Sequence, residues 1–419
     1  MLKRITFLSL FLTISWISLL YAQFFDYTDD VYNDKIRSVQ CYRGKDERNL
    51  PYLFLKENNQ ITVEFDELRA SPQAYYFSVV HCNYDWQPSR LMISDYWDDL
   101  SYFQITDYRS SQNTLVPYIH YTFQVPNKFK VTGNYAIKVF KDLDENDVIL
   151  TRRIIVVDDP LKITLGQGQA ISENVADRFA MQTLFFNLIP NQLFPLQNPR
   201  RDIKVRVIQN GRWETSRELE PMYILNDRIE FSFSAQNDFE GGNEFRRCDI
   251  RSYRYRSETV SKYEIRDNMV IAYQVEDKPR SSNVYLKEFD MNGAFFIINR
   301  EFPNYDIESD YILTIFTLKV QQPYKYDVYV LGRFNDWKFR KDCKMKYDPT
   351  YKVYTAEIWL KQGVYDYCYA LNKKGETDER SIEGSFFETE NNYMILVYYR
   401  GPADWTDKII GFKRIGVNE

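Results

Sequence analysis

Alternation of apolar and polar residues with a period of two dominates this chain and predicts β-strands. Residues 118–125 place four apolar side chains on one face, as in a strand with one buried side. Residues 135–140 and 149–157 have the same pattern, and the polar run 142–147 between them indicates a turn. These segments predict a hairpin that closes a first domain, with its exit at residues 158–160.

Further strands are predicted in the middle of the chain, where one segment is ambiguous. Residues 203–208, followed by Asn210-Gly211 and Trp213, predict a hairpin because both turn residues tolerate a positive φ. Residues 228–234 alternate and predict another strand. Residues 174–187 fit a short helix or a strand equally well, since their apolar positions satisfy both periods.

The last hundred residues also consist of short strand patterns. They lie at residues 326–332, 352–360, 364–371 and 392–399. Short strands without a long amphipathic helix are typical of a β-sandwich. The sequence therefore predicts an all-β protein of tandem immunoglobulin-like β-sandwich domains with little helix.

The chain has 419 residues, which exceeds one typical domain of roughly 100–150 residues. We predict a signal peptide over 1–22, an N-terminal β-sandwich domain over 23–159, a middle β-rich domain over 160–320 and a C-terminal domain over 321–419. No long linker is visible, so we expect the domains to pack as one rod or arc.

The first residues have the layout of a cleavable secretory signal. Lys3 and Arg4 precede an apolar run over 5–20, and Ala22 offers a small residue before the cut. The alternative is a membrane anchor, but this run is shorter than the about 20 apolar residues of a spanning helix. The residue directly after the cut is Gln23 and not a cysteine, which disfavours a lipid anchor. We therefore expect an exported protein.

The five cysteines lie far apart and none has the spacing of a zinc site. In an oxidising compartment, Cys343 could pair with Cys368, or Cys41 with Cys82. The alternative is that all five, Cys248 included, are small buried apolar residues.

The amino-acid composition excludes several classes of protein and of function. Hydrophobic residues make up 44% of the chain and aromatic residues 17%, which excludes wholesale disorder and favours sheet. The 54 basic and 59 acidic residues leave no general attraction for a phosphate backbone, so we predict no nucleic-acid partner.

No pattern of catalytic or metal-binding residues stands out. His81 and His120 are the only histidines, and each lies in a strand pattern beside aromatic residues, as a structural histidine would. Nucleotide-loop, serine-elbow and zinc-helix motifs are missing from the sequence. A pair of carboxylates at catalytic distance stays open. We predict a non-enzyme without cofactor or metal that acts by recognition, through aromatic and arginine side chains or open sheet edges.

An ordered series of motifs carries a resemblance to a known family. They include VHCNYDWQPS, GGNEFRRCD and LKQGVYDY, and the segments lie at 80–89, 107–114, 118–123, 126–127, 241–249, 290–293, 310–311, 360–367, 382–385, 388–391 and 397–400. This series resembles the type IX secretion system plug protein family and covers nearly the whole mature chain.

The resemblance implies a non-catalytic periplasmic protein at the inner face of the outer membrane of diderm bacteria. It would bind the periplasmic mouth of the outer-membrane translocon barrel and seal the pore, as one copy per translocon and without a membrane span of its own. A barrel wide enough for folded cargo would otherwise leak solutes whenever its outward gate opened.

We expect the sealing contact to use residues of the matched loops. The candidates are Trp86 and Arg90 in the first domain, and Phe245, Arg246 and Arg247 in the second. A structural alternative exists for these residues: Trp86 could anchor a core or turn, and Arg246 could pair with an internal carboxylate. Gly241-Gly242 is interpreted as a turn that needs a positive φ.

The C-terminal domain also permits a different interpretation. Residues 328–337, which end in Phe-Asn-Asp-Trp, are similar to early-set immunoglobulin-like modules that bind starch and glycogen. That similarity implies that Trp337 would stack on a glucose ring. The lysine position of those modules is Cys368 here, and the turn 373–377 holds no tryptophan. A glycan-binding protein of the envelope is therefore the alternative function, and a packing role for Trp337 is favoured.

Overall fold

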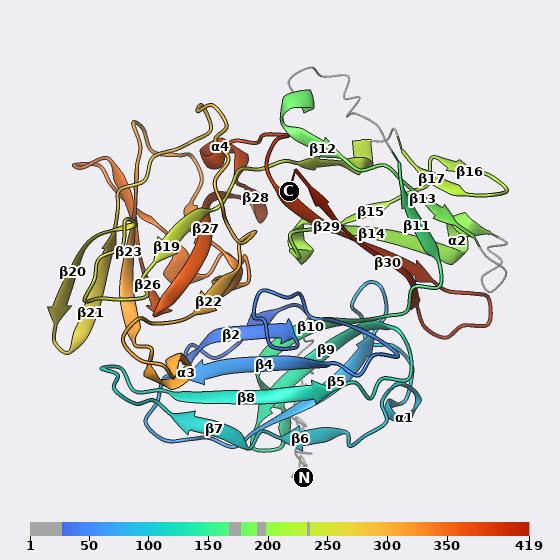
Figure 1. The fold of residues 1–419 in the computed structure, drawn as a ribbon, viewed down its shortest axis with the longest axis horizontal. Helices are drawn as coiled ribbons and strands as arrows, with labels where there is room; N and C mark the ends of the chain where they lie inside the picture. The colour runs from blue at the N-terminus through green and yellow to red at the C-terminus, as the bar shows by residue number, and fades with distance from the viewer. Residues whose placement is uncertain (1–26, 167–176, 191–197, 233–234, 419) are drawn as a thin grey trace, which may run out of the picture.

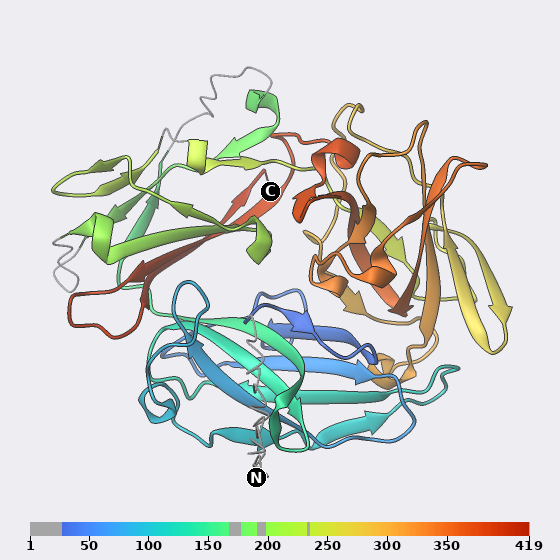
Figure 2. The same ribbon diagram turned by 180° about the vertical axis from the view of Figure 1, so that it is seen from behind.

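Three β-sandwich units arranged as a triangle make up the fold (Figures 1 and 2). The computed structural model describes residues 27–166, 177–190, 198–232 and 235–418, and the predicted signal peptide over 1–22 lies outside them. Strands dominate and every α-helix in this part of the chain is a single turn. The prediction of an all-β chain of tandem β-sandwiches is confirmed.

The first unit packs a six-stranded sheet on a four-stranded sheet. The strand orders are β1-β10-β9-β5-β6, with β3 paired to β10, and β2-β4-β8-β7. Its elements are β1 Asp30–Val31, β2 Ile36–Arg43, β3 Tyr52–Phe54, β4 Gln60–Glu67, β5 Tyr75–Cys82, α1 Ile93–Tyr96, β6 Tyr102–Gln104, β7 Asp107–Ser110, β8 Ile119–Pro126, β9 Gly133–Lys141 and β10 Asp144–Val157.

Period-two alternation explains this sandwich. On β8, Ile119, Tyr121, Phe123 and Val125 all point into the core between the two sheets. The ring of Tyr121 stacks on Phe65 of β4, with centroids 4.9 Å apart. Burial of these side chains provides the main driving force for folding of the unit.

The middle unit contains two four-stranded sheets and a two-stranded ribbon. The orders are β11-β13-β17-β16, β15-β14-β29-β30 and β12-β18. Its elements are β11 Lys162–Leu165, β12 Met181–Thr183, β13 Phe186–Ile189, α2 Pro199–Asp202, β14 Ile203–Gln209, β15 Arg217–Leu219, β16 Tyr223–Ile224, β17 Ile229–Phe231, β18 Asp238–Glu240, β29 Asn391–Tyr399 and β30 Lys408–Val417, with 3-10 turns at Asp177–Phe179, Trp213–Thr215 and Ala235–Asn237.

In the sequence, the third unit is inserted into the middle unit: it occupies the chain between β18 and β29. Its sheets are β20-β21-β23-β26-β25 and β19-β27-β22, with β24 and β28 also paired to β27. Its elements are β19 Arg246–Asp249, β20 Val260–Arg266, β21 Met269–Gln274, β22 Phe295–Ile297, α3 Tyr305–Glu308, β23 Tyr311–Lys319, β24 Val328–Leu331, β25 Lys346–Asp348, β26 Val353–Lys361, β27 Gly363–Lys373, β28 Glu376–Asp378 and α4 Arg380–Glu383, with 3-10 turns at Arg333–Asn335 and Lys341–Cys343.

Strand pairing crosses the boundary predicted at residues 320 and 321. β23 pairs along its whole length with β26, so residues on both sides of that boundary share one sheet. β29 pairs with β14, which returns the end of the chain to the middle unit. The expected rod or arc is also incorrect, because each unit contacts both others (Figure 1). Strand patterns reveal where strands lie but not which distant strand each one joins.

Two local predictions in the middle unit can be compared with the structure. The described part of 174–187 contains both alternatives: a single 3-10 turn at Asp177–Phe179, followed by β12 and the start of β13. Asn210 and Gly211 adopt φ values of 51° and 70°, as predicted for the turn. The return strand after it was misplaced, because Trp213 starts a 3-10 turn and β15 begins only at Arg217.

The five cysteines are unpaired, and all except Cys41 are buried. Neither disulfide that the sequence left open is formed. The structure agrees with the alternative, in which these residues pack as small apolar groups.

Gly241 and Gly242 mark the point where the chain crosses from the middle unit into the third. Gly242 has the predicted positive φ, 67°. Gly241 is needed for a different reason: a Cβ there would collide with the carbonyl oxygen of Phe386 on the returning crossover. The Gly242 carbonyl accepts a hydrogen bond from the Phe386 amide at 2.8 Å, so the two crossovers are in direct backbone contact.

Gly241→Ala should lower the free energy of unfolding by at least about 2 kcal/mol, because two backbone segments must separate to accept the methyl group. Gly242→Ala is the matched control: it has open space around its Cβ position and should lose only about 1 kcal/mol through its positive φ. Urea denaturation of both variants measures the difference. A larger loss in Gly242→Ala would contradict the contact between the crossovers.

Candidate functional site

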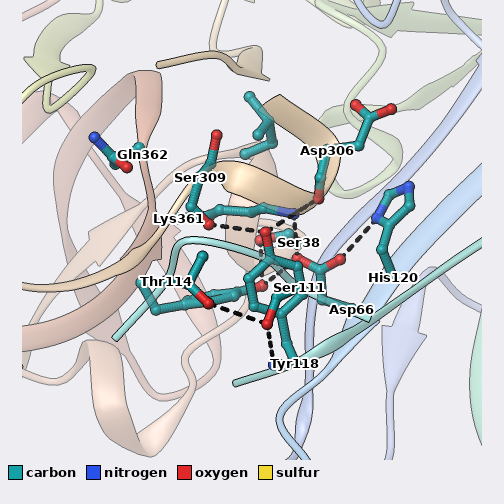
Figure 3. A network of polar contacts seen from close by, with 12 residues as sticks. Ser38, Asp66, Ser111, Thr114, Tyr118, His120, Asp306, Ser309, Lys361 and Gln362 are labelled. Atoms are coloured by element: carbon teal, nitrogen blue, oxygen red, sulfur yellow. Dashed lines mark hydrogen bonds and ion pairs between the residues drawn. The ribbon is translucent and has the colours of Figure 1, made fainter. Parts of the chain in front are cut away.

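A buried polar network joins the first unit to the third (Figure 3). Asp66 of β4 lies at its centre. One carboxylate oxygen is 2.7 Å from Lys361 Nζ of β26 and accepts a 2.7 Å hydrogen bond from Tyr311 Oη of β23. The other oxygen is 2.8 Å from His120 Nδ1 of β8. The side chains of Asp66 and Lys361 are each only 1% exposed, so this is an ion pair almost without water.

The charge of Asp66 is maintained by its partners. Burial raises the pKa of this carboxyl, but the Lys361 ammonium and His120 outweigh that effect and hold the pKa below its ordinary value of 3.8. Lys361 Nζ also donates to the carbonyl oxygen of Asp306 at 2.6 Å and lies 4.2 Å from the ring centre of Tyr118. Both charges are therefore fully coordinated by groups from two units.

Backbone groups extend this joint. The carboxylate of Asp310 accepts the amides of Leu115 and Val116 at 2.7 and 3.1 Å. Tyr118 Oη donates to the carbonyl oxygen of Ser309 at 2.8 Å. The loop before β8 is thus bound to the segment that connects α3 to β23.

Thr122, His120 and Asp66 are connected in the order of the nucleophile, base and acid of a catalytic triad. Thr122 Oγ1 lies 3.0 Å from His120 Nε2, and His120 contacts Asp66. Asp66 differs from a catalytic acid because it already balances the ammonium of Lys361. We therefore assign the network a structural role: it fixes one unit against another.

Aromatic and polar contacts join the first unit to the middle unit. The rings of Trp86 and Trp213 meet edge to face with centroids 4.7 Å apart, and the Arg153 guanidinium lies 4.3 Å from the Trp86 ring centre. Tyr398 Oη donates to Asn134 Oδ1 at 2.8 Å. Trp86 is thereby part of a core that two units share.

An arginine joins the middle unit to the third. Arg212 binds Glu379 of the third unit at 2.5 Å and Glu214 of its own unit at 2.7 Å. Its guanidinium also lies 3.8 Å from the ring centre of Trp337. Three joints of this kind, one at each side of the triangle, hold the units as one body.

The residues predicted to contact a partner divide into buried and exposed ones. Trp86, Phe245 and Arg246 are buried. Arg246 binds Asp277 at 2.6 Å and Glu383 at 3.0 Å, which is the internal pairing considered as its alternative. Arg90 and Arg247 are exposed, so a direct contact with a partner stays a prediction for these two.

Trp337 is buried as well. One face of its ring is covered by Arg212, and Phe245 packs beside it with centroids 5.4 Å apart. Only 8% of Trp337 is exposed, so the ring offers no open platform for a sugar at the protein surface, and the packing role favoured from the sequence agrees with the structure. Trp337 lies in the turn after β24. Asp336 and Trp337 both have a positive φ there, 57° and 58°.

The histidines are both buried in the first unit. Burial lowers the pKa of His81 to about 4, which keeps the ring neutral. His120 belongs to the network around Asp66. Sequence reasoning identified His120 as structural but missed Asp66 and Lys361, because a charged residue in a strand pattern reads as solvent-facing unless a second unit is known to cover it.

The described residues contain neither a membrane-spanning helix nor a group of metal ligands. No helix within the described residues is long and apolar enough to span a membrane. In the same part of the chain, no three or more His, Cys, Asp or Glu side chains gather as metal ligands would.

A comparison with family models identifies the first unit. Residues 36–158 match the model described as "Type 9 secretion system plug protein 1st domain". The N-terminal domain of this chain belongs to the type 9 secretion system plug family. The resemblance stated from the sequence motifs is confirmed. This match associates the chain with type IX secretion and with the cell envelope. The likeness of the C-terminal segment to glycogen-binding modules stays a prediction.

The chain also resembles a solved structure along most of its length. A hypothetical protein from Parabacteroides merdae, known from a crystal structure, superposes with a TM-score of 0.87 at 29% identity, over 93% of this chain and 99% of that one. No curated protein matches the chain. The whole three-unit architecture is therefore found in another protein, not the plug domain alone.

Removal of the central carboxylate should destabilise the plug-family fold strongly. Asp66→Asn leaves the Lys361 ammonium buried without a counter-charge, so we expect a loss of about 3 kcal/mol in the free energy of unfolding. The control is Asp46→Asn, which breaks the exposed pair with Arg48 and should cost less than about 1 kcal/mol. Urea denaturation measures both. Equal losses would contradict the role of the buried pair.

The same pair predicts a pH dependence. Because the folded pKa of Asp66 lies below its ordinary 3.8, the unfolded state takes up the proton first as the pH falls. Asp66 therefore contributes stability above about pH 4 and loses it as the pH falls through the folded pKa. The stability difference between the wild type and Asp66→Asn should shrink from pH 7 to pH 3. A difference that stays constant over this range would refute the assignment.

Proposed function

We propose that this protein is a non-catalytic periplasmic plug that binds the periplasmic mouth of the type IX translocon barrel and seals its pore. One copy would act per translocon, at the inner face of the outer membrane. The observation that carries the proposal is the match of residues 36–158 to the plug family. The predicted export signal over 1–22 agrees with this location.

The three-unit architecture is suited to a protein that blocks a pore. A seal against small solutes must not deform, and three units that each contact the other two cannot hinge about a single linker. The Asp66–Lys361 pair, the Trp86–Trp213 contact and the Arg212–Glu379 pair connect the three sides. Any swing of one unit would break at least one of these ion pairs or expose an aromatic ring to water, and both cost stability.

An exposed apolar segment supports a protein contact. We define it as residues 284–289, in which Val284, Leu286 and Phe289 are 92%, 69% and 87% exposed. The segment belongs to no strand in the part of the chain that the structure describes. Exposed apolar side chains so close together are typical of an interaction site, and extended backbone can pair with an edge strand of a partner.

Arg247 connects this segment with the residues predicted from the sequence. Its guanidinium donates to the carbonyl oxygen of Phe289, so an exposed arginine and exposed apolar side chains lie together. Arginine and aromatic residues carry much of the binding energy in protein interfaces. We infer that the segment 284–289 with Arg247 forms part of the contact with the barrel.

A tagged copy should recover a very large outer-membrane protein from detergent-solubilised envelopes. Replacing Val284, Leu286 and Phe289 together by serine should reduce this recovery at least tenfold, since apolar area is lost from the interface. Tyr351→Ser is the control, because Tyr351 is also exposed on the third unit but lies outside the segment. Immunoblotting of the eluted barrel gives the readout.

Dye entry separates the seal from mere association. Cells without the protein should admit a small periplasm-excluded dye when the translocon is open to the outside, and cells with the wild type should not. Envelopes that stay impermeable without it would overturn the plug function. Full recovery of the barrel by the triple serine variant would exclude only the segment.

A further inference from the structure

A cavity of about 290 Å³ lies where the three units meet. The first unit contributes Tyr52, the middle unit Trp213, and the third unit Phe295 and Trp337 to its wall. These four aromatic residues come from distant parts of the chain, so the cavity exists only in the assembled triangle. Its size lies at the lower end of sites for small organic molecules.

The charged residues of the cavity are nearly all paired. Five basic and four acidic side chains line it. Arg152 contacts Asp336 at 3.3 Å, Arg212 contacts Glu214 at 2.7 Å and Lys338 contacts Asp30 at 2.6 Å. Arg153 donates from Nε to the carbonyl oxygen of Tyr27 at 2.5 Å and covers the ring of Trp86. These pairs satisfy four of the five cations.

Arg333 is the exception. Its guanidinium has no hydrogen-bond or ion-pair partner among the described residues, although its backbone amide is bound to Gly293. Burial lowers the pKa of Arg333 to about 10, against the attraction of Asp366 and Asp29. The group thus stays charged at neutral pH. The Arg333 side chain is partly buried, and its guanidinium is free to pair with an anion that enters the cavity.

The acidic residues near Arg333 do not serve as that anion. Asp29 accepts the backbone amide of Arg153 at 2.7 Å, and Glu47 accepts Gln40 Nε2 at 2.6 Å. Burial raises the pKa of Asp29, and it raises that of Glu47 to about 7. Both carboxyls therefore gain protons more readily than usual and repel an incoming anion less.

We propose that this central cavity binds a small organic carboxylate, which pairs with Arg333 while its apolar body contacts the aromatic wall of Tyr52, Trp213, Phe295 and Trp337. A guanidinium offers two parallel donors that match the two oxygens of a carboxylate. A phosphate dianion fits less well, because only one cation is free and Asp29 and Glu47 lie close by. This site is independent of the plug function.

Binding of such a ligand would also join the three units. A molecule that contacts all of them in the assembled state, and none in the unfolded chain, raises the stability of the assembly in proportion to its occupancy. The cavity would then connect the concentration of an envelope metabolite with the stiffness of the triangle.

The test uses the full mature chain and isothermal titration calorimetry. N-acetyl-L-tryptophan carries an aromatic body and a carboxylate, and N-acetyl-L-tryptophanamide differs only by the loss of that charge. We expect the carboxylate to bind at least tenfold more tightly than the amide, and inorganic phosphate to bind no better than chloride. Arg333→Gln should weaken carboxylate binding at least tenfold and leave amide binding unchanged.

Arg254→Gln is the matched control, since Arg254 is an exposed arginine of the same unit, and it should bind like the wild type. Without ligand, Arg333→Gln should unfold at a midpoint temperature close to that of the wild type, because the partly buried guanidinium has no protein partner to lose among the described residues. Equal affinity of the wild type for acid and amide, absence of carboxylate binding at millimolar concentration, or unchanged binding in Arg333→Gln would each overturn the proposal. The first two outcomes need no variant to fold.

Discussion

The arrangement of the three units depends on the desolvation of the Asp66–Lys361 pair. Each charge belongs to a different unit, and each is almost completely removed from water. Separating the units would break this ion pair together with the hydrogen bonds that complete it across the same interface. The pair therefore fixes the position of one sandwich against the other. In this position Tyr311 and His120 complete the contacts of the Asp66 carboxylate.

The motifs that carry the family resemblance lie largely at the joints between units. Trp86 packs on Trp213, Tyr118 binds Ser309, and Lys361 pairs with Asp66. Arg400, the last residue of the series, donates to Asn83 at 2.7 Å. Burial removes Trp86, Tyr118 and Lys361 from any direct contact with a partner. A surface that meets another protein has to be sought elsewhere on the molecule.

Two features remain after the joints are accounted for, and they differ in kind. The segment 284–289 presents apolar side chains to water, which is unfavourable until a partner covers them. The Arg333 guanidinium has the opposite problem, since it lines the central cavity as a partly buried charge without a counter-charge. Natural proteins keep such local conflicts mainly where function requires them. Rigid joints around both features mean that neither conflict can be relieved by a shift of the units.

The sequence by itself determined the fold class and the positions of most strands, because alternation records which face of each strand is buried. The four apolar side chains that alternate along residues 118–125 all lie in the core, as predicted. It also determined the family, through spaced motifs.

Only the tertiary structure decided that β29 returns to pair with β14, since the sequence does not state which distant edge a strand joins. The structure alone also decided that Trp86 and Arg246 are buried and that Asp66 faces Lys361. Whether an aromatic or charged side chain faces water depends on a second surface that covers it, and that surface comes from residues hundreds of positions away.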